Sequence, residues 1–157
     1  MSATYQIRDE PVGGAQRGLI VDPFWALLGL MVGGAWLGAA LFAINAWFLR
    51  GPNWQRELAL TVALLLGAPV IALLMVGAGD AGVIPEVGMK YAFLTVILWK
   101  LAVGYWIYFQ QQTGFDLYQY FGGKPQNGLP IVVLSALFLN RYVIAAVDHP
   151  LWRTMVS

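Results

Sequence analysis

A single uncharged stretch near the N-terminus constrains this chain more than any other feature. From Pro23 to Leu49 it contains 27 consecutive residues without a charged side chain. A helix rises about 1.5 Å per residue, so about 20 apolar residues are enough to cross the hydrocarbon core of a bilayer. The stretch is longer than the apolar part of a cleaved signal peptide, which has about 7 to 15 residues. The sequence therefore predicts a retained membrane-spanning helix over residues 23–49.

The composition of the whole chain agrees with a membrane location. Of its 157 residues, 59% are apolar and 11% are charged, whereas a soluble domain has about 25% charged residues. So few charged side chains cannot cover a surface that faces water. We therefore expect an all-α integral membrane protein whose main partner is the lipid bilayer.

Three further apolar stretches predict three further spans. They cover approximately residues 58–79, 91–109 and 129–147. A polar tail, residues 1–22, precedes the first span. The aromatic-rich segment 115–121, between the third and fourth spans, is expected to lie along the membrane interface. The predicted fold is thus a single domain, residues 23–157, of four transmembrane helices joined by short loops.

Pro69 lies near the middle of the second predicted span. Proline lacks a backbone N–H, and its ring clashes with the preceding helical turn, so a proline inside a helix usually kinks it. We therefore expect a kink at Pro69.

Several classes of function are disfavoured by the residue types that the sequence contains. It has no cysteine and a single histidine, His149, so thiolate metal sites, iron–sulfur clusters and a two-histidine haem site are not expected. Its net charge of +1 comes from scattered side chains and gives no basic surface for nucleic acid. Ser135 has no histidine within a span to activate it. We accordingly expect no metal, no cofactor, no nucleic-acid partner and no enzymatic activity.

The first predicted span carries closely spaced glycines. They form two overlapping Gly-x-x-x-Gly registers: Gly29, Gly33, Gly34 and Gly38. In a bilayer, such spacing lets two helix backbones approach closely and is typical of helix association. One interpretation is a seam for self-association. The other is packing within the chain, for which Ala63 and Gly67 give the second span a compatible small face.

Two basic residues fall inside predicted spans, Lys100 in the third and Arg141 in the fourth. Each costs about 2.5 to 3.5 kcal/mol at the centre of a membrane helix, and the spans contain no acidic residue to pair with them. One interpretation is a polar cavity that binds an anion or a lipid headgroup, with Asn45 and Asn140 as neutral partners. The other is structural: the long side chains reach toward the interface, or Arg141 pairs with Asp148.

The orientation follows from the basic residues outside the spans. Four spans place both termini on one side of the membrane, and that side holds four of these residues against three on the other. Because basic residues favour the cytoplasmic side, we expect cytoplasmic termini in a plasma (inner) membrane.

Two functional hypotheses follow, and both involve helix association. In the first, the chain is an oligomeric scaffold or accessory subunit that packs its helices against itself or against another membrane protein. In the alternative, it is an oligomeric channel or carrier for small anions that uses Lys100 and Arg141. The sequence favours the first hypothesis, because four short spans rarely build a transport route within one chain and the alternative therefore also requires an oligomer.

Overall fold

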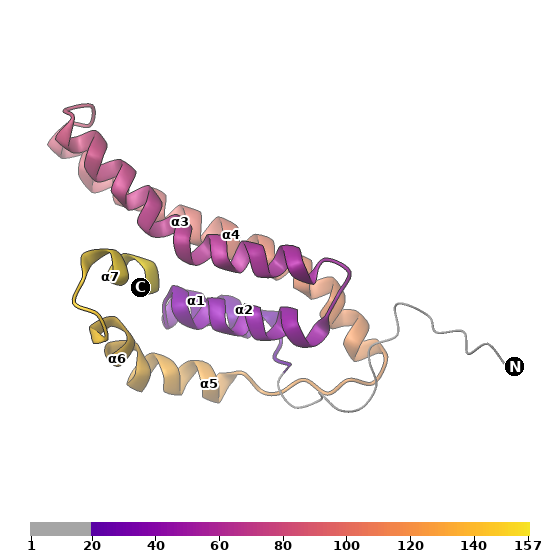
Figure 1. The fold of residues 1–157 in the computed structure, drawn as a ribbon. Coiled ribbons are helices and arrows are strands. Elements are labelled where there is room, and N and C mark those ends of the chain that lie inside the picture. Colours follow the sequence, from indigo (N-terminus) through magenta and orange to yellow (C-terminus); the bar gives the residue numbers. More distant parts are fainter. Residues whose placement is uncertain (1–19) are drawn as a thin grey trace, which may run out of the picture.

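The computed structural model describes residues 20–157, except for the side chains at positions 86, 87, 89, 90, 92 and 93. This part of the chain is helical, with turns and loops between the helices and no strand among the described residues (Figure 1). The all-α class predicted from the sequence is therefore confirmed. Of the predicted polar tail, residues 1–22, positions 1–19 lie outside the described residues.

The elements follow one another with short connections. In chain order they are α1 (Pro23–Val32), α2 (Ala35–Leu49), α3 (Trp54–Asp80), α4 (Glu86–Tyr120), α5 (Leu129–Leu134), η1 (Ser135–Leu139), α6 (Asn140–Ala145) and α7 (Pro150–Val156). The π-helical turn η1 joins α5 and α6 into one apolar segment, Leu129–Ala145. Of the described helices, α3 is the one long and apolar enough to cross a membrane, while α1, α2 and Leu129–Ala145 are apolar but shorter. Four spans therefore stay a prediction.

The first apolar stretch folds back on itself, unlike the continuous helix predicted over residues 23–49. α1 ends at Val32, and α2 begins at Ala35 after a turn at Gly33 and Gly34. Gly34 has φ 93° and ψ 173°, a backbone conformation that is essentially restricted to glycine. The two glycines therefore end the first helix and allow the second to return beside it as a helical hairpin (Figure 1).

Glycines let the two arms of the hairpin approach closely. A Cβ atom on Gly38 of α2 would lie 2.5 Å from the Cβ atom and 2.8 Å from the Cα atom of Leu30 in α1. A Cβ atom on Gly29 would lie 3.3 Å from the Cγ atom of Leu37. Glycines of the Gly-x-x-x-Gly registers thus lie in the contact between α1 and α2, within one chain.

The hairpin forms the centre of the fold. α3 and α4 pack along one side of it, and the Leu129–Ala145 segment lies along the other (Figure 1). Most of the buried apolar cluster belongs to the hairpin: Ala26, Leu27, Leu30, Ala35, Leu37, Ala39, Leu41 and Phe42. The surrounding helices contribute Leu64, Val103, Ile107 and Val132. Contacts with the hairpin therefore help to position α3, α4 and α5.

α4 is longer than the third predicted span. It runs as one helix from Glu86 to Tyr120, through the stretch Gln110–Gly114 that follows the predicted end of the span. The segment 115–121 is not separate from the third predicted helix but forms the last turns and the end of α4. Its predicted place along the membrane interface stays a prediction. Phe115 within it is buried in the fold, so tertiary packing holds this part of α4 in place.

Pro69 lies within α3, which continues as a single helix from Trp54 to Asp80. The proline removes one hydrogen bond from the helix, and packing of α3 against α2 and α4 supports the helix around it. The kink itself stays a prediction.

We predict that Gly38→Ala destabilises the fold and that Gly114→Ala does not. The added methyl group at position 38 would meet the backbone of Leu30, and overpacking of this kind costs about 1 to 3 kcal/mol of unfolding free energy. At Gly114, inside α4, nothing lies within 4 Å of the added atom, so the better helix propensity of alanine adds up to about 1 kcal/mol. Thermal unfolding in detergent, followed by circular dichroism, compares the two variants. Equal midpoints would contradict close packing within the hairpin.

Candidate functional site

A groove of about 700 Å³ lies between α1, α4 and α7 and is the candidate functional site. Its apolar wall is made by Leu30, Met31, Val96, Ile97 and Leu101. Its polar residues are Lys100, Arg153, Thr154 and Ser157. The groove thus combines an apolar wall with two basic side chains, an arrangement that suits an amphipathic ligand with a negative charge.

Lys100 is half-buried at the polar end of the groove. Its Nζ atom donates to the backbone carbonyl oxygen of Thr154 at 2.8 Å. Thr154 belongs to the last turn of α7, where carbonyl groups lack a partner within the helix and a positive charge is favoured. The charge of Lys100 is therefore stabilised by the end of a helix, and not by the predicted neutral partners Asn45 and Asn140.

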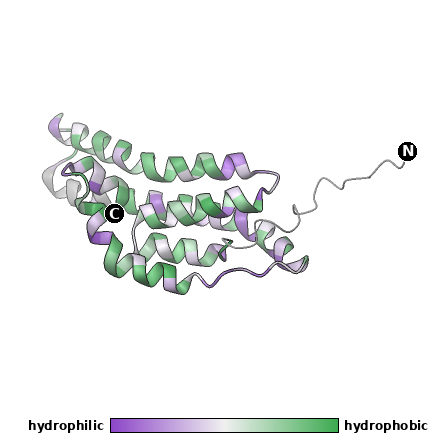
Figure 2. Cartoon of the chain, turned by 60° about the horizontal axis from the view of Figure 1, so that its bottom comes forward, coloured by the Kyte–Doolittle hydropathy of each residue, from purple (hydrophilic) through white to green (hydrophobic). Residues whose placement is uncertain are grey.

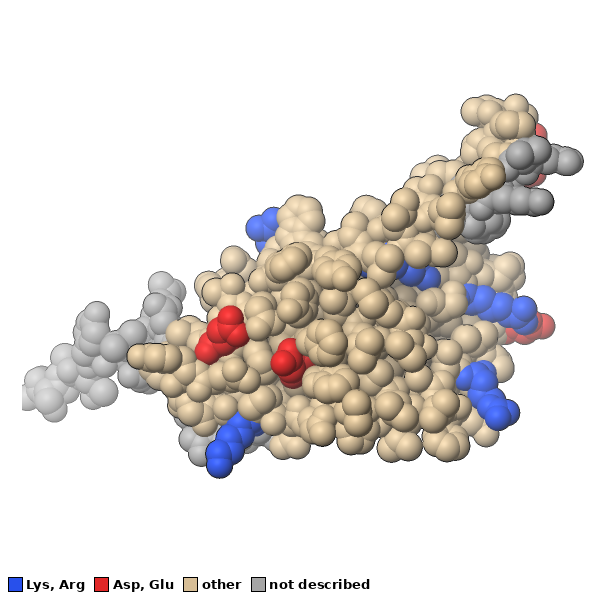
Figure 3. All heavy atoms as spheres, turned by 180° about the vertical axis from the view of Figure 1, so that it is seen from behind, with Lys and Arg blue, Asp and Glu red and all other residues tan. Residues whose placement is uncertain are grey.

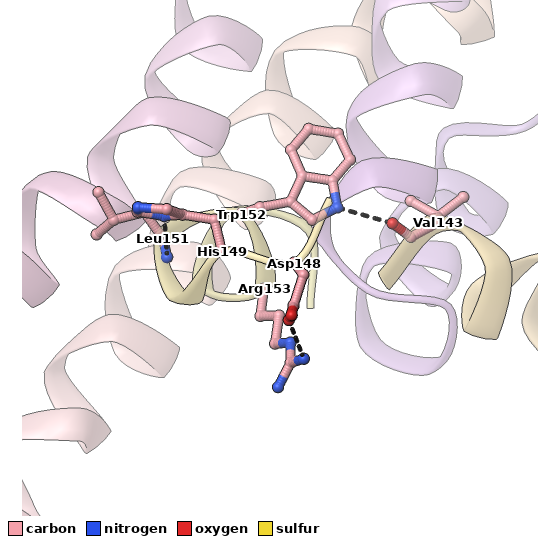
Figure 4. A network of polar contacts seen from close by, with 6 residues as sticks. All are labelled: Val143, Asp148, His149, Leu151, Trp152 and Arg153. Carbon is pink, nitrogen blue, oxygen red and sulfur yellow. Dashed lines mark hydrogen bonds and ion pairs between the residues drawn. The ribbon is translucent and has the colours of Figure 1, made fainter. Parts of the chain in front are cut away.

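Polar contacts cap the start of α7 and link this helix to α6 (Figure 4). The indole Nε1 of Trp152 donates to the carbonyl oxygen of Val143 at 2.7 Å, and Nδ1 of His149 accepts from the backbone N–H two residues later at 3.2 Å. Arg153 and Asp148 form an ion pair of 2.9 Å, with 60% and 94% of their side chains exposed. Because an ion pair so exposed contributes little to stability, the Trp152 bond is the main polar link between the two helices.

The C-terminal end of α7 also contacts the tip of the hairpin. The backbone N–H of Ala35 donates to the carbonyl oxygen of Ser157 at 3.2 Å. A Cβ atom on Gly34 would lie 2.6 Å from the carbonyl oxygen of Val156. The hairpin turn and α7 therefore pack directly on each other, and together they set the shape of the groove.

The structure does not bring Lys100 and Arg141 together in the groove. Arg141 is exposed on α6. The ion pair that Asp148 makes among the described residues is with Arg153, and not with Arg141. The basic pair that lines the groove is therefore Lys100 and Arg153.

Both of the predicted polar asparagines connect α2 to another segment of the chain. Asn45 is fully buried, and its side-chain amide accepts from the N–H of Val21 at 3.1 Å and donates to the carbonyl oxygen of Val21 at 2.8 Å. This pair of bonds, the Asn45 clamp, closes the base of the hairpin. Asn140 accepts from the indole N–H of Trp36 at 3.3 Å, which links α6 to α2.

The small residues on α3 accommodate a tryptophan. The indole of Trp99 in α4 packs against Gly67, where a Cβ atom would collide with the ring. The Nε1 atom of Trp99 donates to the carbonyl oxygen of Ala63 at 3.4 Å. At Gly33, an added Cβ atom would collide with the side chain of Leu37. The small residues on α3 therefore contact α4, and Gly33 contacts the other arm of the hairpin, so both contacts lie within one chain.

Sequence reasoning missed a buried polar group between α2, α3 and α4. Glu57, Thr61 and Gln111 are all buried. Gln111 donates from Nε2 to the carbonyl oxygen of Phe42 at 2.8 Å, and the Thr61 hydroxyl donates to the carbonyl oxygen of Glu57 at 2.9 Å. The sequence contains a pattern that indicates burial of Glu57 and Thr61. These two residues share one helix face with the buried Leu64, at spacings of four and three residues.

Comparison of the chain with protein-family models, with curated proteins and with solved structures found no match. Among the described residues, no group of three or more histidine, cysteine, aspartate or glutamate side chains is placed to hold a metal ion. The candidate site therefore rests on the geometry of the groove.

We predict that Asn45→Ala lowers the free energy of unfolding by about 2 to 4 kcal/mol, because it leaves the buried N–H and carbonyl groups of Val21 without partners. Asn53→Ala is the matched control, since Asn53 is exposed and its side chain makes no capping hydrogen bond. There we expect a change within about 0.5 kcal/mol. Thermal unfolding in detergent, monitored by tryptophan fluorescence, measures both. The same loss of stability in the two variants, or in neither, would contradict the role of the clamp.

Proposed function

We propose that this chain is an integral membrane protein that acts as a scaffold or accessory subunit, by packing its helices against a second copy of itself. The observation that carries the proposal is an apolar stripe that faces outward along α3. This α3 stripe consists of Ala59, Val62, Leu66, Val70, Leu73 and Gly77, all of them exposed.

The α3 stripe has the spacing and composition of a helix-packing surface. Its members recur every three or four residues and so follow one side of the helix. The larger side chains within it, Val62, Leu66, Val70 and Leu73, are each 53–54% exposed. They belong to the helix that is long and apolar enough to cross a membrane. Small residues near both ends of the stripe would let a neighbouring helix approach closely.

The outer surface of the other helices supports a membrane location. Large apolar side chains are exposed along α4 and along Leu129–Ala145: Leu94, Leu98, Trp106, Phe109, Leu134, Leu137 and Phe138. Hydrophobic residues follow the length of the helices, and hydrophilic residues lie mostly at helix ends and in connections (Figure 2). Charged side chains are few in the space-filling view, and most of the surface is uncharged (Figure 3). In water such a surface would promote aggregation, whereas lipid can cover it.

The hairpin fits a membrane as a re-entrant element. α1 and α2 have 10 and 15 residues, so at about 1.5 Å per residue each is shorter than a hydrocarbon core of about 30 Å. Irregular backbone at membrane depth is tolerated where protein covers it, and α7 packs on the turn at Gly34. In the proposed arrangement α1 and α2 enter and leave on one face, while α3, α4 and Leu129–Ala145 cross. The two termini would then lie toward opposite faces, in place of the same-side arrangement expected from four spans.

The alternative, an anion channel or carrier based on Lys100 and Arg141, has less support from the geometry. Such a path would need both basic side chains in one cavity. Lys100 lies in the groove with Arg153, whereas Arg141 is exposed on α6.

Disulfide cross-linking tests the α3 stripe, because the chain contains no cysteine of its own. We expect Leu66→Cys to form an intermolecular disulfide under mild oxidation in liposomes, since the stripe would bring two copies of position 66 together. Leu137→Cys is the matched control at an exposed position on η1, and it should form no intermolecular disulfide. The native mass of the unmodified protein in mild detergent should be that of a dimer or a larger oligomer. A monomeric native mass, or equal cross-linking at both positions, would refute self-association through the stripe.

A further inference from the structure

We propose that the groove between α1, α4 and α7 binds an acidic phospholipid, with its phosphate at Lys100 and Arg153 and an acyl chain along the apolar wall. The inference rests on the membrane location proposed above and does not depend on the α3 stripe. The stripe lies on another helix, and none of its residues lines the groove.

The two basic side chains of the groove have hydrogen-bond donors available for a phosphate. The ammonium group of Lys100 has three N–H donors, and its bond to Thr154 uses one. The guanidinium group of Arg153 has five donors, and its ion pair with Asp148 is made through Nη2. Asp148 is 94% exposed, so solvent can compensate its charge. Guanidinium and ammonium groups both bind phosphate oxygens, the former in a bidentate fashion.

A bound phosphate would also improve the environment of Lys100. Among the described residues, Lys100 donates to a neutral carbonyl group, and no side-chain carboxylate forms an ion pair with it. A basic side chain in the interior of a membrane is unfavourable unless a polar or anionic partner reaches it. An anionic headgroup in the groove would be such a partner.

The apolar wall indicates that the anion belongs to a lipid. Leu30, Val96 and Leu101 line the groove, and Ile97 and Leu98 continue the apolar surface onto the outer side of α4. An acyl chain could follow this surface from the groove into the surrounding lipid, and its burial there would add to the binding. A free inorganic anion would gain nothing from the wall. The volume of about 700 Å³ falls within the usual range of small-ligand sites, about 300 to 1,000 Å³.

Native mass spectrometry of the full chain tests this site. The protein is purified in detergent with an equimolar mixture of phosphatidylglycerol and phosphatidylcholine, and we expect it to retain phosphatidylglycerol preferentially. One basic residue changes the binding of an anionic lipid by about fivefold. Lys100→Gln and Arg153→Gln should therefore each lower the ratio of retained phosphatidylglycerol to phosphatidylcholine by about fivefold. Arg141→Gln removes an exposed charge outside the groove and should leave the ratio unchanged.

Two further arms separate the possible causes. Lys100→Arg keeps the charge and should keep the preference for phosphatidylglycerol. A loss of this preference in Lys100→Gln but not in Lys100→Arg would therefore come from the lost charge, and not from unfolding of α7. Excess inorganic phosphate should not displace phosphatidylglycerol, and displacement would assign the groove to a free anion. Equal retention of both lipids by the unmodified chain, or the same loss in Arg141→Gln as in the groove variants, would overturn the proposal. Cross-linking at position 66 would be unaffected, so failure here leaves self-association standing.

Discussion

Close contact between α1 and α2 is the interaction on which the rest of the structure depends. Small residues let the two backbones approach, Gly34 supplies the turn, and Asn45 closes the open end by binding the backbone of Val21. The outer helices pack on this hairpin, and α7 packs on its tip. The groove depends on the same contact, because one of its walls, with Leu30, belongs to α1.

Polar side chains reinforce this arrangement by binding backbone carbonyl groups on other helices. The donors are Trp99, Lys100, Gln111 and Trp152. In apolar surroundings a polar group without a partner is strongly unfavourable, so each of these side chains favours the one arrangement of helices in which its partner is within reach. The same bonds that satisfy the polar groups thus fix how the helices pack. A rigid arrangement of this kind would suit the proposed scaffold function.

The sequence predicts the helical class and the position of the apolar segments, because hydrophobicity and helix formation depend on residue type. It does not predict the break at Gly34, since Gly-x-x-x-Gly spacing is compatible with both a continuous helix and a hairpin. α4 extends past Gln111, whose side chain binds the carbonyl group of Phe42. Lys100 binds the carbonyl group of Thr154. Both carbonyl groups lie far away in the chain from the side chain that binds them. Every residue has a backbone carbonyl group, so residue types do not reveal which ones a side chain will bind. The sequence predicts Lys100 in a polar cavity, but it does not predict that Arg153 takes the place of Arg141 there.

A distance between two spin labels tests the hairpin most directly. Phe24→Cys and Trp47→Cys place labels at exposed positions on α1 and α2, in a chain with no other cysteine, and electron paramagnetic resonance in liposomes gives their separation. The hairpin predicts a separation of about 10 to 20 Å, because the axes of packed helices lie about 8 to 10 Å apart. A continuous helix over residues 23–49 would separate the labels by about 35 Å, and that result would contradict the fold on which the groove and both proposals rest.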